Sequence, residues 1–156
     1  MNRRHAGIAA LILFTVAVLI GALAMAGRAL VFAADYLAGT AFLAVVMIAA
    51  WCTKCQARKE GCAHALPGLI AGCLPARWQG PYTLLDHAGV LIPALIILLA
   101  PQYWLLQNPA YFVVFWALVI TAALLNRRTV CPDCTNRECP LSGAKESGAP
   151  IETAAR

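Results

Sequence analysis

The chain has 156 residues, of which 62% are hydrophobic and only 12% are charged, and its mean hydropathy is +0.73. A soluble domain carries about a quarter charged residues, so this composition excludes a surface that faces mostly water. The net charge of +5 comes from basic residues that flank apolar segments. This distribution is typical of membrane topology and does not predict a nucleic-acid-binding surface, so no nucleic-acid partner is expected.

Four apolar segments are long enough to cross a bilayer as helices. In chain order, we expect these helices at residues 8–26, 29–51, 84–100 and 110–125. A bilayer core about 30 Å thick needs roughly 20 apolar residues in a helix. The sequence therefore predicts an all-α integral membrane protein with four transmembrane helices that contact the lipid bilayer.

The first of these segments could also be a cleavable signal peptide, because Ala24-Met25-Ala26 resembles a small-residue cleavage site. Its apolar run is longer than the roughly 7–15 apolar residues of a signal peptide. We therefore prefer a retained helix, and a cleaved signal stays open as the alternative.

The distribution of Lys and Arg predicts the orientation. Eleven of the twelve lie before the first helix, between the second and third helices, or after the fourth, and only Arg28 lies in an expected external turn. Loops rich in Lys and Arg remain in the cytoplasm. We therefore expect a multi-pass protein of the cell's cytoplasmic (inner) membrane, with both termini and the middle loop in the cytoplasm.

These predictions divide the chain into six segments. Each of the two helical pairs is followed by a cysteine cluster. The six segments are a cytoplasmic N-terminus (1–7), a first helical hairpin (8–51), a cytoplasmic Cys-rich loop (52–83), a second helical hairpin (84–126), a cytoplasmic Cys-rich knuckle (127–143) and a disordered tail (144–156). Repetition of hairpin and cysteine cluster predicts a duplicated unit, and internal repeats are common in membrane proteins.

Few polar groups lie within or beside the apolar segments. Asp35 is expected at the outer end of the second helix, beside Arg28, and Asp86 and His87 are expected to form an interfacial pair at the start of the third. A transporter would be expected to carry a series of ionisable groups near the membrane midplane, which this sequence lacks. The sequence also lacks a nucleotide-binding glycine loop and a Ser-His-Asp arrangement, so a stand-alone enzyme is not expected.

All seven cysteines lie on the predicted cytoplasmic side, in two groups that each begin with a C-x2-C pair. Such a pair places two sulfurs on one side of the chain, and two pairs can complete a tetrahedral site for zinc or hold an iron–sulfur cluster. Cytoplasmic thiols are kept reduced, so these clusters favour metal binding over disulfides. The candidate ligands are Cys52, Cys55, Cys62, Cys131, Cys134 and Cys139, with His64 and Cys73 as secondary candidates.

Two ligand arrangements remain open. We prefer one shared site of Cys52, Cys55, Cys131 and Cys134, which would join the two hairpins. The alternative is two local sites, one of Cys52, Cys55, Cys62 and His64, the other of Cys131, Cys134, Cys139 and Cys73. Neighbouring basic residues are expected to favour thiolate over thiol, namely Lys54, Arg58, Lys59, Arg127 and Arg128.

The segment Cys131-Pro132-Asp133-Cys134 resembles a rubredoxin-type or zinc-ribbon knuckle, although the usual following glycine is missing. Together these features predict a small membrane subunit or anchor that carries a structural zinc or an iron–sulfur centre and works with a membrane or soluble protein partner. The alternative is a thiol-based protein that traffics or transports soft metals such as Cu(I) or Hg(II), or that exchanges disulfides.

Overall fold

The computed structural model describes residues 2–55, 62, 64–77, 81–132 and 134. The expected ligand Cys139, the basic residues Arg58 and Lys59, and the expected disordered tail (144–156) lie outside the described residues.

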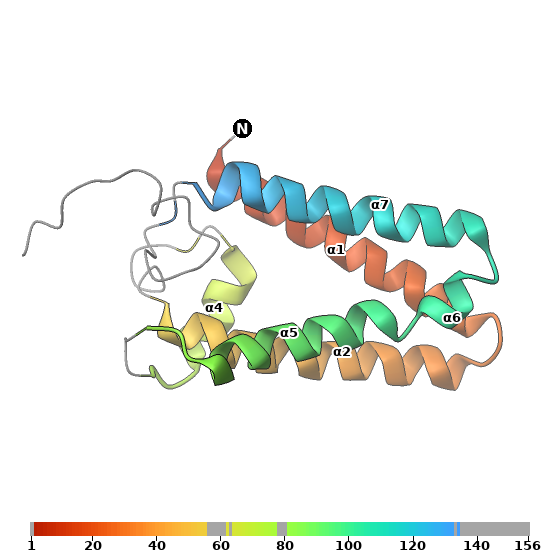
Figure 1. The fold of residues 1–156 in the computed structure, drawn as a ribbon, viewed down its shortest axis with the longest axis horizontal. Coiled ribbons are helices and arrows are strands. Elements are labelled where there is room, and N and C mark those ends of the chain that lie inside the picture. The colour runs from red at the N-terminus through yellow and green to blue at the C-terminus, as the bar shows by residue number, and fades with distance from the viewer. Residues whose placement is uncertain (1, 56–61, 63, 78–80, 133, 135–156) are drawn as a thin grey trace, which may run out of the picture.

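Four long helices run side by side along the molecule, and short helices lie near their ends (Figure 1). The long helices are α1 (Arg3–Ala26), α2 (Leu30–Trp51), α5 (Leu84–Leu99) and α7 (Pro109–Leu125). The short ones are the 3₁₀ turn η1 (Cys52–Lys54), α4 (Ala65–Cys73), α6 (Gln102–Leu105) and the π-helical η2 (Asn126–Val130). Within the described residues there is no strand.

Each long helix, together with any short helix that continues it, is long and apolar enough to cross a membrane. The four spans are Arg3–Ala26, Leu30–Lys54, Leu84–Leu105 and Pro109–Val130. Large apolar side chains project outward along them, among them Phe42, Leu91 and Val113, each at least 60% exposed. These observations confirm an all-helical, multi-pass membrane protein whose outer surface is suited to lipid.

The first helix begins earlier than the hydropathy predicts, because a polar residue caps it. The side chain of Asn2 accepts a hydrogen bond from the backbone N–H of Arg4 at 3.2 Å. Asn is among the preferred N-cap residues. Arg3 and Arg4 therefore form the first turn of α1 instead of a preceding loop.

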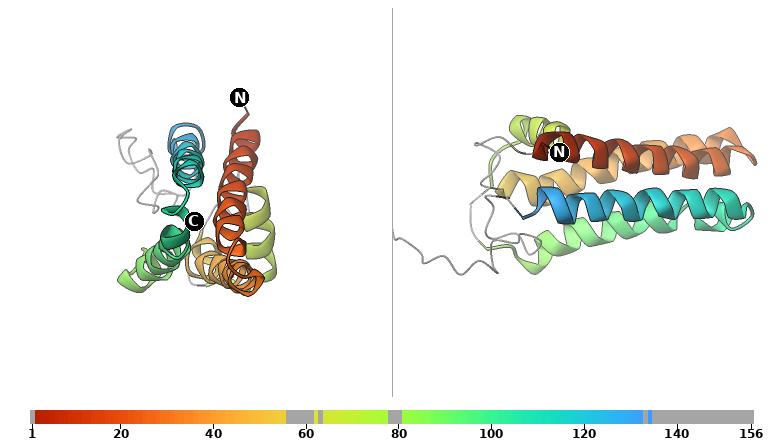
Figure 2. Two further views of the ribbon diagram at one scale, coloured as in Figure 1. Left: turned by 90° about the vertical axis from the view of Figure 1, so that its right-hand side faces the viewer. Right: turned by 90° about the horizontal axis from the view of Figure 1, so that it is seen from above.

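Packing joins helices that are distant in the sequence. The most extensive contacts link α1 with α7 and α2 with α5, followed by those between α1 and α2. The left view of Figure 2 looks along the bundle and shows α1 beside both α2 and α7, with α5 beside α2. Helices α5 and α7 contact each other much less than α5 contacts α2 or α7 contacts α1.

Small residues allow the close approach of α2 and α5. A Cβ atom added to Gly89 would lie 2.7 Å from the Cβ of Ala50, which is too short for a real contact. Small residues at helix interfaces let backbones come together in membranes, where packing replaces the hydrophobic effect. Gly89 thus fixes the spacing of these two helices near the end that bears Cys52.

A buried hydroxyl group satisfies a backbone carbonyl near the C-terminal end of α5. Pro101 has no N–H, so the carbonyl of Ile97, four residues earlier, loses the partner that a continuing helix would supply. The hydroxyl of Tyr36 in α2 donates to this carbonyl oxygen at 3.0 Å. Tyr36 is buried in a cluster with Val18 and Ile97, so this bond ties α2 to α5 inside the apolar core.

Candidate functional site

The first cysteine pair follows directly on the end of α2. Cys52 begins the single 3₁₀ turn of η1, and the backbone N–H of Cys55 donates to the carbonyl oxygen of Cys52 at 3.2 Å. Both side chains are half-buried. Because α2 runs straight into this turn, the pair is held at the end of a membrane-spanning helix.

The second pair has the same local backbone arrangement. The N–H of Cys134 donates to the carbonyl oxygen of Cys131, again at 3.2 Å. Cys131 is itself tied to η2, since its N–H donates to the carbonyl oxygen of Asn126 at 2.9 Å. Both C-x2-C segments thus close a tight turn with one hydrogen bond between their first and last residues.

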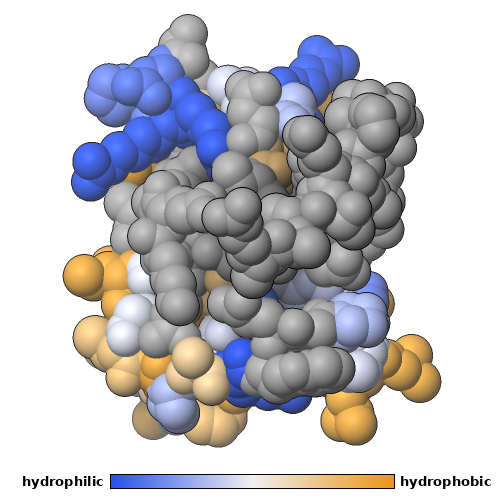
Figure 3. Space-filling view, turned by 90° about the vertical axis from the view of Figure 1, so that its left-hand side faces the viewer, coloured by the Kyte–Doolittle hydropathy of each residue, from blue (hydrophilic) through white to orange (hydrophobic). Residues whose placement is uncertain are grey.

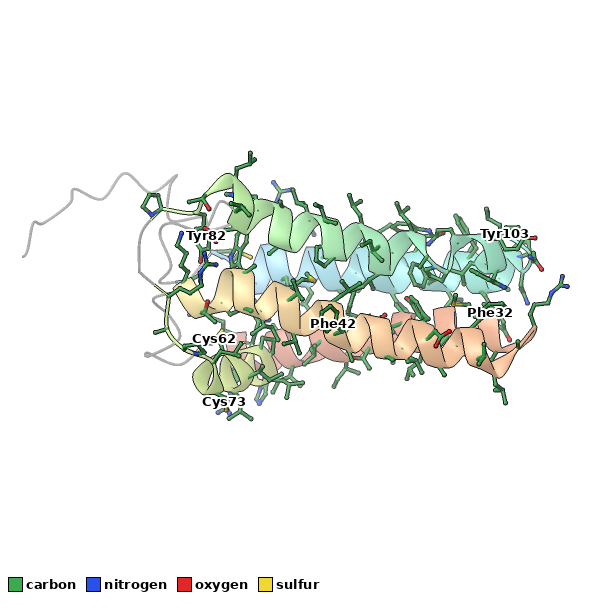
Figure 4. The ribbon with its side chains drawn as sticks, turned by 90° about the horizontal axis from the view of Figure 1, so that it is seen from below. Phe32, Phe42, Cys62, Cys73, Tyr82 and Tyr103 are labelled. Atoms are coloured by element: carbon green, nitrogen blue, oxygen red, sulfur yellow. The ribbon has the colours of Figure 1, made fainter. Side chains whose placement is uncertain are left out.

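Both pairs lie at the same end of the bundle. Figure 1 shows the ends of α2 and α7, the beginning of α1, and α4 all at this end, and Figure 3 faces it. Figure 4 places the labelled Cys62, Cys73 and Tyr82 here, and Phe32 and Tyr103 at the opposite end.

The first turns of α1 contact the segment that leads to the second cysteine pair. Val130, which precedes Cys131, is buried against Ala6 of α1. The first cysteine turn, η1, instead contacts α2 and α4, and α4 in turn contacts α1. The positive charge of Arg3 in α1 acts on His64, which precedes α4.

Cys62 and His64 lie at the beginning of α4. The Cys62 side chain rests against Gly68, where an added Cβ atom would come within 2.9 Å of the Cys62 Cβ. Burial, and secondarily the charge of Arg3, lowers the pKa of His64 below its ordinary value of 6.5. The neutral imidazole that this favours is the form that binds metals. Cys73, at the other end of α4, is exposed.

A buried ion pair joins the first cysteine turn to α5. The Lys54 Nζ lies 2.7 Å from Asp86 Oδ2, and the exposed fractions of the two side chains are 5% and 1%. Lys54 also donates to the carbonyl oxygen of Pro81 at 2.8 Å. Arg77, whose side chain is 51% exposed, donates to the other carboxylate oxygen at 2.9 Å.

Asp86 is further held by the cap of its own helix. The hydroxyl and the backbone N–H of Thr83 each donate to Asp86 Oδ2 at 2.9 Å, and the Asp86 N–H donates to the Thr83 hydroxyl. A carboxylate with this many donors and two cations remains charged although it is buried. The sequence predicted the place of Asp86 but not this set of partners. The spacing of Thr83 and Asp86 before an apolar run is a helix-capping signature that could have revealed it.

These contacts correct one expectation. The predicted pair of Asp86 with His87 is wrong, because Asp86 faces Lys54 and Arg77, whereas His87 Nδ1 lies 2.8 Å from the carbonyl oxygen of Thr83. His87 also packs edge-on against Trp51, with 5.3 Å between the ring centres. The ammonium group of Lys54 is paired with Asp86, and its expected effect on the ionisation of the neighbouring thiols stays a prediction.

Asp35 does not pair with Arg28 in the described structure, and the guanidinium group instead donates to Gln107 Oε1 at 3.0 Å. The turn after α1 is therefore joined to the turn before α7.

Within the described ranges, no three His, Cys, Asp or Glu side chains gather closely enough to hold a metal ion. Among the residues that the structure describes, the two cysteine pairs lie at one end of the bundle and do not form a four-ligand site. Comparison with known protein families, with curated proteins and with solved structures found no match for this chain. A functional assignment therefore rests on the residues themselves.

Proposed function

We propose that this membrane protein binds a metal through cysteine thiolates at the end of the bundle where α2 and α7 terminate. The proposed ligands are Cys52, Cys55, Cys131 and Cys134. The observation that carries the proposal is the matching backbone turn of the two pairs, which follow the ends of α2 and α7 at one end of the bundle.

Four thiolates suit either a structural zinc or an iron–sulfur cluster. Zinc is our first choice, because the four sulfurs come from the ends of two helices and a tetrahedral ion would join them. Metal binding of this kind draws separate segments together, so its binding free energy contributes to the stability of the fold. An iron–sulfur centre would instead pass electrons between a soluble donor and a membrane acceptor.

The remaining candidates belong to the same proposal. Cys62, Cys139, His64 and Cys73 can complete local sites if the two pairs bind metal separately. The hairpin-and-knuckle duplication is supported by the repeated C-x2-C turn. The positive-inside rule supports a cytoplasmic location for this end, in the cell's inner membrane. A chain with such short loops would act there as a subunit or anchor for a protein partner.

A second candidate function is the transfer of soft metals such as Cu(I) or Hg(II). One feature favours it specifically. Each C-x2-C pair supplies two sulfurs from one tight turn that a single backbone hydrogen bond closes. Two sulfurs are sufficient for soft ions, and such a site exchanges its metal readily. Exchange of disulfides through the same pairs is a variant of this function.

Anaerobic purification in detergent, followed by metal analysis and a visible spectrum of the same sample, tests the proposal. About one zinc per chain without visible absorption is expected for a shared structural site. Iron with acid-labile sulfide and visible absorption would identify a redox subunit. Absence of both metals, with copper or mercury bound and readily exchanged on addition, would favour the transfer function.

A matched cysteine variant sharpens this experiment. Cys73→Ser alters an exposed thiol outside the shared set and is expected to leave the zinc content unchanged. Cys131→Ser is expected to abolish it. Equal loss in both variants would favour the local site that contains Cys73.

A further inference from the structure

A pocket of about 500 Å³ lies at the end of the bundle opposite the cysteines. Its walls come from the end of α1 and the turn after it, and from α6 and the start of α7. Figure 4 shows Phe32 and Tyr103 at this same end. The pocket is therefore separate from the proposed metal site, in place and in chemistry.

Several of the residues that line this pocket carry hydrogen-bond donors. Arg28 contributes a guanidinium group, Trp104 an indole N–H, Asn108 an amide and Tyr111 a hydroxyl. Among the described residues, Arg28 donates only to Gln107, and the side-chain groups of the other three form no hydrogen bond. Four residues that line one pocket thus carry donor groups with capacity to spare.

The charge of the pocket is uncompensated. No acidic side chain lines it, and within the described ranges Arg28 forms no ion pair. A guanidinium group with several unused N–H donors matches the geometry of a phosphate group, which it can contact through two bonds at once.

The apolar wall indicates what accompanies this anion. Leu23 lines the pocket and is 57% exposed on the flank of α1, where the span meets its outer turn. Trp and Tyr side chains, here Trp104 and Tyr111, favour the boundary between hydrocarbon and headgroups. An amphiphile could place its headgroup against Arg28 while its chain follows Leu23.

We propose that this pocket binds a phosphate-bearing anion, with the headgroup of a phospholipid as its source, through Arg28 and the indole N–H of Trp104. Phosphate free in solution has the same recognition chemistry, so the test must distinguish the two sources. The proposal does not depend on the metal site.

The test is native mass spectrometry of the full, delipidated chain in an uncharged maltoside detergent. The probes are dioleoyl phosphatidylglycerol, dioleoylglycerol and inorganic phosphate, each titrated separately. Phosphatidylglycerol is expected to fill one preferred site, and dioleoylglycerol, which lacks the phosphate, is expected to bind at least about tenfold more weakly.

Two variants with matched controls locate the site. Arg28→Gln is expected to weaken phosphatidylglycerol binding about tenfold, whereas Arg4→Gln, at the opposite end, leaves it unchanged. Trp104→Phe keeps an aromatic side chain but replaces the indole and removes its N–H, so a smaller loss of a few-fold is expected. Tyr103→Phe, an exposed neighbour outside the pocket, is its control. Circular dichroism establishes that each variant is folded.

The outcomes separate clearly. Loss of phosphatidylglycerol binding in both pocket variants, without binding of inorganic phosphate, supports a lipid site. Binding of inorganic phosphate with the same dependence on Arg28 supports the anion site and assigns it to a soluble source. The proposal is overturned if wild type and Arg28→Gln bind phosphatidylglycerol with equal affinity and inorganic phosphate with equal affinity. It is also overturned if the wild type binds phosphatidylglycerol and dioleoylglycerol equally well.

Discussion

The ammonium group of Lys54 lies 2.7 Å from the carboxylate of Asp86, and both side chains are almost wholly buried. Lys54 stands between Cys52 and Cys55 in the sequence, so this ion pair fastens the first cysteine turn to the beginning of α5. The turn is thereby held by two helices, α2 through the chain and α5 through the salt bridge.

Replacement of one partner of this pair should be strongly destabilising. Lys54→Met leaves a buried carboxylate with a half-exposed Arg77 as its remaining cation, and we expect the free energy of unfolding to fall by about 3–5 kcal/mol. Denaturant unfolding in detergent, followed by circular dichroism, measures this loss. Arg77→Gln is the control and should cost below about 1 kcal/mol, because that side chain is half exposed. A double variant, Lys54→Met with Asp86→Leu, should recover much of the stability. Equal losses in Lys54→Met, Arg77→Gln and the double variant would contradict a stabilising role of the Lys54–Asp86 ion pair.

The bond from Tyr36 to the Ile97 carbonyl predicts a coupling with Pro101. Tyr36→Phe removes the only hydrogen bond described for that carbonyl and should lower the free energy of unfolding by about 1 kcal/mol. Pro101→Ala supplies a backbone N–H four residues after Ile97, so the same Tyr36→Phe change should cost less in that background. A double-mutant cycle measures the difference. Strict additivity of the two changes would show that the hydroxyl does not replace the missing N–H.

The contact of Gly89 with Ala50 predicts intolerance of any side chain. Gly89→Ala would force α2 and α5 apart, and overpacking of this kind costs about 1–3 kcal/mol in the free energy of unfolding. Gly39 provides a matched control within α2, because an added Cβ atom meets nothing within 4 Å. Gly39→Ala should be neutral or stabilise by up to about 1 kcal/mol. Similar thermal melting shifts for both variants would show that the helices have room to adjust.

The four spans and the clustering of cysteines at one end could be predicted from the sequence, because uncharged runs and flanking charges report directly on membrane crossing. The neighbours of each helix could not. Side chains such as Phe42 and Leu91 are apolar on the lipid side just as core residues are apolar inside, so hydropathy does not indicate which face packs. Specific contacts, such as that between Gly89 and Ala50, determine which face of a helix packs against its neighbour.

Part of the candidate site could likewise be predicted. The C-x2-C spacing indicated two similar turns, and both pairs form the same backbone hydrogen bond. The ion pair of Lys54 with Asp86 could not be predicted, because the two residues are far apart in the sequence and no spacing rule connects them. The expected ligand Cys139 lies outside the described residues, so its place in the site stays a prediction.

The environment of His64 predicts an unusual titration in the metal-free protein. Burial, assisted by the charge of Arg3, lowers its pKa below 6.5, so the folded chain binds this proton less tightly than the unfolded chain. The stability contributed by this group is therefore complete above pH 6.5 and falls as the pH drops below that value. NMR of labelled histidine rings measures the pKa. Arg3→Gln should raise it without restoring 6.5, because burial is the larger cause. A pKa at or above 6.5 in the wild type would contradict this environment.

In the shared site that we propose, the two cysteine pairs hold one metal between them. X-ray absorption spectroscopy of the anaerobically purified protein tests this arrangement, because it counts the sulfur atoms around the metal. We expect four sulfurs at about 2.3 Å from zinc, and loss of the metal in both the Cys52→Ser/Cys55→Ser and the Cys131→Ser/Cys134→Ser variants. A metal bound by only two sulfurs, or a metal that survives removal of either pair, would contradict the shared site.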